Sequence, residues 1–295
     1  MRKSIVLYHA NCNDGFAAAY AAWVALGNDE EYVPVKYGDT PPDVTDKVVY
    51  ILDFSYTPDE LYDMAAKAYH VVMLDHHQTA MDKWSHLLVT GKDGGMMFHR
   101  GNLDVVFDME RSGAQMAWDW FNPGVPHPRF INHIGDRDLW KFSLPGTREI
   151  CAAMNSHEKD FRLWNDLAGP TRYVELLTEG GAILRMQERQ VANILAGPLR
   201  PVSFDLCSPD SGPYVVTGLA ANVRENISEV GNAIAEKSGT FSLTFFIEDD
   251  MAVCSLRSIG DYDVTPIALK FGGGGHKNAA GFKMWAPQFL AEVWE

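Results

Sequence analysis

The chain has 295 residues, of which 46% are hydrophobic and 22% are charged, and its formal net charge is −14. These proportions are typical of a globular protein with one large domain or two ordinary ones. An acidic surface opposes the many phosphate contacts that hold long duplex nucleic acid, so we expect no such partner. No apolar stretch reaches the roughly 18–20 residues needed to span a bilayer.

The first residues and the cysteines indicate a cellular compartment. Met1-Arg2-Lys3-Ser4 leads directly into the apolar run at 5–8, which is too short for a signal-peptide core and has no small-residue cleavage site after it. The cysteines are widely spaced and form no C-x-x-C pair, which argues against a structural zinc site or a disulfide framework. We therefore expect a cytoplasmic protein that does not act on membranes.

The first half of the chain alternates short apolar runs with segments of helical pattern. Thr57-Pro58-Asp59-Glu60 is typical of a helix start, with an N-cap, a proline in the first turn and acidic residues after it. The expected strands cover 5–8, 48–52, 71–74 and 103–107, and the expected helices cover 15–26 and 58 to about 68. This β-α-β rhythm predicts an α/β fold with a parallel, doubly wound sheet.

Beyond residue 170 the pattern changes twice. A mostly helical segment at 171–197, interrupted by Gly180-Gly181, indicates a connector between domains, and a turn-rich segment follows at 208–213. The last part has expected strands at 214–219, 241–247 and 251–256, a helix at about 227–237 and a hairpin turn at 248–250. We therefore expect a catalytic domain at 1–170, a helical connector at 171–197 and a smaller α+β domain at 198–295.

Carboxylates and imidazoles follow the first three expected strands, and a later segment adds two more carboxylates. Because the carboxyl ends of parallel strands meet at one edge of a sheet, we expect the first three groups to converge. Singly, each has an ordinary explanation, such as a turn cap or a surface ion pair. Their joint occurrence at strand ends favours a common site. The residues are His9, Asp14, Asp53, Asp75, His76, His77, Asp136 and Asp138.

Carboxylates packed this closely repel one another, and divalent cations are the usual compensation. Mixed imidazole and carboxylate ligands suit Mn²⁺, Zn²⁺ or Fe²⁺ better than Mg²⁺. Two such cations that share a carboxylate and a water would generate hydroxide near neutral pH and hold a phosphoryl group for in-line attack. The residue types therefore predict a metal-dependent reaction at phosphorus.

Two other segments are candidate anion sites. The four glycines at 272–275 lack Cβ atoms, so their backbone N–H groups can approach an anion closely, with His276 and Lys277 beside them. A flexible linker is the alternative, but its flanks are apolar. Arg257, at the end of an expected strand, is a second anion contact. Ser112 precedes a helix whose first N–H groups would meet a phosphate, unless Ser112 simply caps that helix.

These motifs together resemble the DHH phosphoesterases with a C-terminal DHH-associated domain, whose relatives include RecJ-type exonucleases, nanoRNases and cyclic-dinucleotide phosphodiesterases. The resemblance covers nearly the whole chain. It implies two Mn²⁺ ions, with Mg²⁺ or Co²⁺ as substitutes, and Asp53 as the bridge between them. It rests on His9, Asp14-Gly15, Asp53, Asp75-His76-His77, Asp136 and Gly273-Gly274-Gly275-His276.

The resemblance also implies a role for each residue. Asp75 would orient an imidazole, and His77 would stabilise charge or protonate the leaving oxygen. The metal ligands would be His9, Asp14, Asp53, His76 and Asp136, with Asp136 favoured over Asp138, which would pair with Arg137. The far end of a short nucleotide would be held by Arg257, Gly273, Gly274, Gly275, His276 and Asn278.

The first motif departs from the family pattern. Family members commonly carry two aspartates there, whereas this chain has Asn11, Asn13 and a single Asp14. Because asparagine is a neutral oxygen ligand, we expect weaker binding of one metal or a resting state with one metal.

The activity that the resemblance implies is that of a manganese-dependent phosphodiesterase or exonuclease. Its substrates would be short single-stranded oligonucleotides or dinucleotides, hydrolysed to mononucleotides as in nanoRNases. The acidic surface and the lack of a third, basic domain favour this over a processive exonuclease on long single strands. A cyclic-dinucleotide phosphodiesterase and a nucleotide phosphatase stay open, as does a non-catalytic nucleotide-binding protein, which only Asn13 supports.

Overall fold

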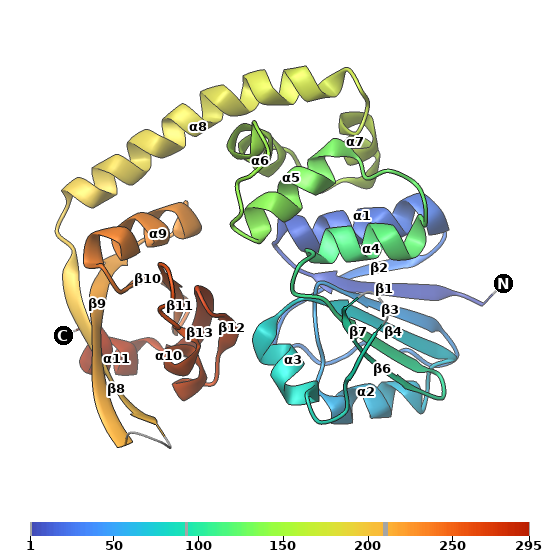
Figure 1. Cartoon of the computed structure of the whole chain (residues 1–295), viewed down its shortest axis with the longest axis horizontal. Helices are drawn as coiled ribbons and strands as arrows, with labels where there is room; N and C mark the ends of the chain where they lie inside the picture. Colours follow the sequence, from blue (N-terminus) through green and yellow to red (C-terminus); the bar gives the residue numbers. More distant parts are fainter. Residues whose placement is uncertain (1, 92–93, 209–211, 295) are drawn as a thin grey trace. The chain divides into compact units, whose positions relative to one another are not determined.

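The computed structural model describes residues 2–91, 94–208 and 212–294 (Figure 1). The chain divides into two compact units, Met1–Leu184 and Arg185–Glu295, and each unit contains its own sheet. The fold is mixed α/β with a large, mostly parallel sheet, which confirms the predicted fold class. Within the described ranges, no helix combines the length and apolar character needed to cross a membrane.

The first unit is built around a seven-stranded sheet in the order β2-β1-β3-β4-β7-β6-β5. The strands are β1 (Ser4–His9), β2 (Glu31–Val35), β3 (Val48–Leu52), β4 (His70–Asp75), β5 (Val89–Thr90), β6 (Met96–Arg100) and β7 (Leu103–Phe107). The helices are α1 (Asn13–Leu26), α2 (Pro58–Ala65), α3 (Gln78–Trp84), α4 (Gly113–Phe121), α5 (Arg129–Asp138), α6 (Thr147–Ser156), α7 (Phe161–Leu167) and α8 (Arg172–Ala196).

The sheet is covered on both faces, as a doubly wound fold requires. Helices α1 and α4 lie on one face and α2 and α3 on the other (Figure 1). Successive strand residues point to opposite faces. On β1, Val6 therefore belongs to the core under α1, whereas Ile5 and Leu7 belong to the core over α2. The chain leaves β1 toward β2 on one side and reaches β3 on the other, so the order reverses between β1 and β3. Ligands of open α/β sheets bind at such a switch point.

The second unit has a six-stranded sheet in the order β12-β13-β11-β10-β9-β8, antiparallel except for the pair β9 and β10. The strands are β8 (Arg200–Ser208), β9 (Gly212–Asn222), β10 (Phe241–Glu248), β11 (Met251–Ser258), β12 (Gly274–His276) and β13 (Ala279–Trp285). The helices are the C-terminal part of α8, α9 (Ile227–Ser238), α10 (Thr265–Lys270) and α11 (Ala286–Phe289), followed by a π-helical turn, Leu290–Trp294.

Several predicted boundaries need correction. Helix α2 ends at Ala65 rather than near residue 68, because Asn102 Nδ2 donates to the carbonyls of Ala65 and Ala68 and turns the chain toward β4. Helix α8 runs unbroken through Gly180, where a Cβ would lie 1.8 Å from the carbonyl oxygen of Glu149. That glycine therefore permits close packing and does not interrupt the helix. The predicted turn at 208–213 lies partly outside the described residues.

Strands that sequence reasoning missed lie mostly at sheet edges. The edge strand β2 contains Pro34. Proline disfavours strands because it has no N–H group to donate, but it is tolerated at a sheet edge, where one side of the strand has no partner. Strands β5 and β6 pair antiparallel beyond β7, outside the β-α-β rhythm.

Candidate metal centre

The parallel strands bring the three predicted polar groups to one edge of the sheet. Tyr8 is the register partner of Leu52, and Leu52 is the partner of Leu74. The next residues along these strands are His9, Asp53 and Asp75. The predicted convergence of the three strand ends is therefore confirmed.

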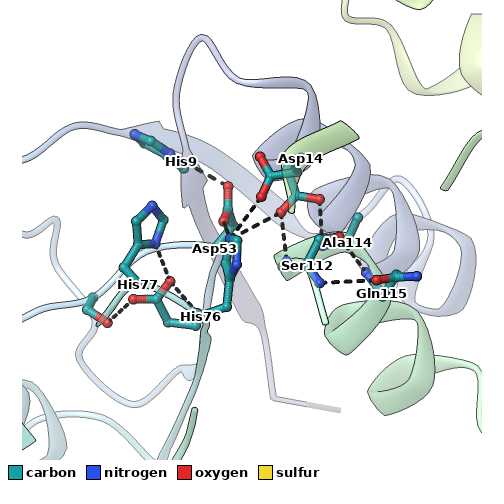
Figure 2. Close-up of polar contacts among 12 residues, drawn as sticks. His9, Asp14, Asp53, His76, His77, Ser112, Ala114 and Gln115 are labelled. Carbon is teal, nitrogen blue, oxygen red and sulfur yellow. Dashed lines mark hydrogen bonds and ion pairs between the residues drawn. The ribbon is translucent and has the colours of Figure 1, made fainter. Parts of the chain in front are cut away.

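The imidazole of His76 lies at the centre of the cluster (Figure 2). Its Nε2 is 3.1 Å from Oδ1 of Asp53, 3.6 Å from Oδ2 of Asp14 and 3.4 Å from Oδ2 of Asp138. His9 approaches from the other side, with Nδ1 3.6 Å from Oδ2 of Asp53. Three carboxylates thus surround one buried imidazole.

Asp53 is the most constrained residue of the cluster. It is 1% exposed, and its φ of 54° lies in the left-handed region that non-glycine residues rarely adopt. Within the described part of the chain, its Oδ2 has no hydrogen-bond partner. A buried carboxylate oxygen without a partner is costly, and a divalent cation would satisfy it.

Two groups of potential metal ligands share Asp53. His9, Asp53 and His77 each offer a ligand atom within 4.8 Å of the others, and so do Asp14, Asp53 and His76. Imidazole nitrogens with carboxylate oxygens form a donor set that suits first-row divalent metals. The side chains present therefore fit one metal ion or a pair of ions that share the Asp53 carboxylate.

Asp14 is held by the N-terminus of helix α4. The N–H groups of Gly113 and Ala114 donate to its two carboxylate oxygens at 2.6 Å and 3.2 Å (Figure 2). Ser112 caps the same helix in a capping box with Gln115. The start of α4 therefore binds a carboxylate of this chain, and Ser112 is the N-cap of that helix. Two of the backbone N–H groups that could have bound a phosphate already donate to Asp14.

Asp75 lies behind the cluster and has contacts at both oxygens. Its Oδ1 accepts from Nδ1 of His77 at 2.7 Å and from the backbone N–H of His76 at 2.9 Å. The hydroxyl of Ser55, a residue that sequence reasoning missed, donates to Oδ2. Asp75 thereby fixes the ring of His77 with Nδ1 engaged and Nε2 on the opposite side.

Burial and mutual charge perturb the acids of the cluster in different directions. Burial, reinforced by the charges of Asp53 and Asp138, holds the pKa of Asp14 well above its usual value. Burial alone would also raise the pKa of Asp53. The hydrogen bond from the His76 ring and the neighbouring His9 ring have the opposite effect, and they hold this pKa below its usual value.

The two imidazoles of the third strand end shift in one direction. Burial opposes their charge, yet the bond to Asp53 and the surrounding carboxylates hold the pKa of His76 well above its usual value. The charge and hydrogen bond of Asp75 likewise raise the pKa of His77. Without metal, the cluster thus draws in protons to compensate its negative charge, and perturbations of this kind mark functional sites.

The structure reverses the predicted placement of the two later aspartates. Asp136 turns away from the cluster and accepts hydrogen bonds from the backbone and hydroxyl of Ser143, from the N–H of Leu144 and from the hydroxyl of Thr147. Asp138 instead faces His76. Asp136 therefore holds the loop after α5, and Asp138 is the acid in position to bind a metal.

Asn13, one of the two asparagines of the first motif, points away from the cluster. Nδ2 of Asn13 donates to Oδ1 of Asn155 at 2.9 Å, and Nζ of Lys159 donates to Oδ1 of Asn13 at 3.1 Å. Both ends of this amide contact α6 and the segment after it. In this arrangement Asn13 supplies no oxygen to the cluster.

The predicted substrate residues lie in the second unit and have local contacts there. Nδ2 of Asn278 donates to Ser258 Oγ and to the carbonyls of Gly260 and Tyr262. Nη2 of Arg257 donates to the hydroxyl of Ser228 at 2.8 Å. Their role in substrate binding stays a prediction.

Glycine is also required for structural reasons in the run at 273–275. A Cβ at Gly273 would lie 2.0 Å from the carbonyl oxygen of Gly281, and one at Gly275 would lie 2.5 Å from that of Ala279. The run at 273–275 is therefore not a flexible linker, because it lets β12 pack tightly against β13. Anion binding by this run, together with His276, stays a prediction.

No family model matches the sequence. Uncharacterized protein R106 of Acanthamoeba polyphaga mimivirus is 29% identical over 308 residues, which covers 94% of this chain. The chain spans 66% of the length of that relative.

Three solved structures are similar over nearly the whole chain. A pGpG-specific phosphodiesterase, PggH, from Vibrio cholerae has a TM-score of 0.48 and 13% identity, covering 97% of this chain and 95% of its own. An exopolyphosphatase-related protein from Bacteroides fragilis has a TM-score of 0.49 and 17% identity, covering 97% and 87%. An uncharacterized protein from Helicobacter pylori G27 has a TM-score of 0.43 and 13% identity, covering 96% and 93%.

Proposed function

We propose that this protein is a metal-dependent phosphodiesterase that hydrolyses short oligonucleotides, including dinucleotides, to mononucleotides. The observation that carries the proposal is the position of Asp53, whose carboxylate belongs to two groups of potential ligands and has one oxygen without a hydrogen bond among the described residues. Two neighbouring cations, as in many phosphatases and nucleases, can stabilise both the attacking and the leaving oxygen of a phosphodiester. The resemblance of the motifs to the DHH phosphoesterases supports the same reaction.

The side chains have separate tasks in this proposal. When bound, divalent cations, with Mn²⁺ as our expectation, would lower the pKa of a water molecule and hold the phosphoryl oxygens. Asp14 and Asp53 hold their positions through helix α4 and His76. His77, whose Nδ1 is engaged by Asp75, directs Nε2 away from Asp75, where it would stabilise charge on the phosphoryl group or protonate the leaving oxygen.

The choice of a short substrate follows from charge. The chain carries a formal net charge of −14, so a long polyanion would be repelled along most of its length. A dinucleotide has few phosphates, and cations at the metal centre can neutralise them locally. This reasoning favours short linear substrates over long single strands.

The test is hydrolysis of a labelled dinucleotide by protein stripped of metal and reloaded with Mn²⁺, Mg²⁺, Zn²⁺ or Co²⁺ in turn. We expect nucleoside monophosphates with Mn²⁺ and no turnover with EDTA. Asp53→Ala should abolish turnover, whereas Asp29→Ala, at an exposed loop position, should not. Equal rates for both variants would refute the proposal.

A substrate panel separates the related reactions. It would compare linear dinucleotides, cyclic dinucleotides, a nucleoside 3′,5′-bisphosphate and long single-stranded DNA. Preferential cleavage of the long strand would overturn the short-substrate proposal, and preference for the cyclic or bisphosphate compound would change the substrate class without changing the metal centre.

A further inference from the structure

Tyr37 is an exposed aromatic residue beside the metal centre that motif analysis did not find. It lies two residues after β2, and Val35, the last residue of β2, is the register partner of His9. Tyr37 therefore follows a strand at the same edge of the sheet as the metal ligands. Its side chain is nevertheless 55% exposed.

The ring of Tyr37 touches two imidazoles of the centre. Its centroid lies 5.9 Å from that of His9 and 6.4 Å from that of His77, both in edge-on arrangements. Both of these imidazoles belong to one group of potential ligands with Asp53. Any phosphoryl group held there would lie next to the tyrosine ring.

Contacts on the protein side hold this ring in place. It packs against the ring of Phe54 at a centroid distance of 4.5 Å, and Phe54 is itself 1% exposed. An aromatic ring that is fixed at one side and open at the other needs little ordering when a flat partner stacks on it.

The negative charge of the site explains why an uncharged contact would help to bind a nucleotide. The cluster is acidic and the chain carries a formal net charge of −14, so the overall charge of the protein does not attract a nucleotide. A nucleobase offers an uncharged, flat face, and stacking on an aromatic side chain does not depend on charge. The base is one ribose away from its phosphate, which matches a ring that neighbours the metal ligands.

We propose that Tyr37 stacks on the base of the nucleotide whose phosphate lies at the metal centre, so that the site selects nucleoside phosphates over phosphates that carry no base. This inference rests on the proposed function of the same site. It makes Tyr37 a residue that determines substrate class, and it predicts poor binding of inorganic polyphosphate and sugar phosphates.

The test measures binding, so that it does not require turnover. Isothermal titration of the Mn²⁺-loaded protein would compare adenosine 5′-monophosphate with ribose 5-phosphate. We expect the wild type to bind the nucleotide more tightly, and Tyr37→Ala to lose about 5- to 150-fold of nucleotide affinity, the range for one stacked base. Tyr37→Phe keeps the ring and should keep the preference.

Two controls separate stacking from a structural effect. Tyr69→Ala removes a ring that is 54% exposed but precedes β4 at the opposite end of that strand, and it should leave nucleotide affinity unchanged. The Mn²⁺ dissociation constant of Tyr37→Ala shows whether the ligands themselves have moved. A large loss of Mn²⁺ affinity would mean that Tyr37 only positions His9, which would overturn the inference.

The other results of the binding comparison also test the inference. If the wild type does not distinguish the two ligands, or if Tyr37→Ala distinguishes them as well as the wild type does, the inference is wrong. The dinucleotide assay with Asp53→Ala judges the proposed function separately. Hydrolysis of dinucleotides by a protein that binds adenosine 5′-monophosphate and ribose 5-phosphate equally well would refute the role of Tyr37 and leave the phosphodiesterase proposal intact.

Discussion

At the scale of single residues, the metal centre holds like charges together through a few directed contacts. Asp14 is bound by two backbone N–H groups, and Asp53 is bound by His76. Without metal, burial and the charges of Asp53 and Asp138 raise the pKa of Asp14, and burial together with the charge of Asp53 raises that of Asp138. A bound cation would relieve this repulsion, so the arrangement of acids costs stability in the metal-free fold and would be stabilised by metal.

The different contacts of Asp136 and Asp138 lead to opposite expectations for two matched variants. Asp136→Asn replaces one acceptor oxygen by an amide, which leaves bonds from Leu144 and Thr147 unmet, so the free energy of unfolding should fall by about 1–3 kcal/mol. Asp138→Asn should leave metal-free stability unchanged or slightly higher, and weaken Mn²⁺ binding at least about tenfold. Urea unfolding and Mn²⁺ titration of both variants provide the measurement. A normal Mn²⁺ affinity in Asp138→Asn would contradict the assignment.

Sequence reasoning found the segment that reaches the cluster but favoured Asp136, whereas Asp138 faces His76, and the reason is geometric. Residues two apart on a helix point about 200° apart, so only one of Asp136 and Asp138 can face the cluster. Which one does so depends on the rotation of α5 against its neighbours. Tyr37 and Ser55 were missed because they belong to no motif, and only the folded sheet edge places them near the ligands.

At the scale of elements, helix α4 links its own stability to metal binding. Its capping residue Ser112 is fully buried, and the next two N–H groups of the helix, those of Gly113 and Ala114, donate to the carboxylate of Asp14 (Figure 2). The cap therefore supports both the first turn of α4 and a potential metal ligand.

This double role predicts the behaviour of Ser112→Ala. Loss of the cap should lower the free energy of unfolding by about 1 kcal/mol. Because the first turn of α4 also supplies the N–H groups that bind Asp14, loosening that turn should weaken Mn²⁺ binding as well. Thr57→Ala is the matched control, because Thr57 caps α2 in the same kind of capping box but contacts no site residue among those described. We expect it to lower stability by a similar amount with unchanged Mn²⁺ affinity. Equal Mn²⁺ affinities in the two variants would exclude a role for Ser112 at the metal centre.

Helix α8 offers a second test at this scale. Glycine inside a helix normally costs about 1 kcal/mol relative to alanine, so Gly180→Ala would be expected to stabilise an isolated helix. Here a Cβ would collide with the backbone of Glu149, and we expect a loss of at least about 1–3 kcal/mol instead. Thr178→Ala, at an exposed position of the same helix, should be nearly neutral. Thermal unfolding of both variants distinguishes the close packing from simple helix propensity.

The same comparison shows which elements a sequence can reveal. Strands β1, β3 and β4 have core residues on both faces and appear as nearly continuous apolar runs, and they were found. Strand β7 was also found, although Asp104 interrupts its apolar sequence. Strand β2 contains a proline, and strands β12 and β13 meet through glycines and small residues. Such segments carry no strong periodicity, and their pairing depends on backbone contacts that the sequence does not display.

At the scale of the whole molecule, the two units have separate sheets and separate cores. The candidate ligands His9, Asp14, Asp53, His76 and Asp138 all belong to the first unit. A ligand that binds only the folded form of a unit stabilises that unit by mass action. Metal should therefore act on one unit and leave the other unchanged.

Calorimetry of the full chain tests this expectation. We expect two unfolding transitions, of which only one moves when Mn²⁺ is added. At 100 times the dissociation constant, Mn²⁺ should stabilise the first unit by about 2.7 kcal/mol, which corresponds to a rise in Tm of roughly 5–10 °C for a unit of this size. Asp53→Ala should remove the shift, because it deletes the carboxylate that both ligand groups share. A Mn²⁺-dependent shift of both transitions, or an undiminished shift in Asp53→Ala, would place the bound metal somewhere other than the edge formed by β1, β3 and β4.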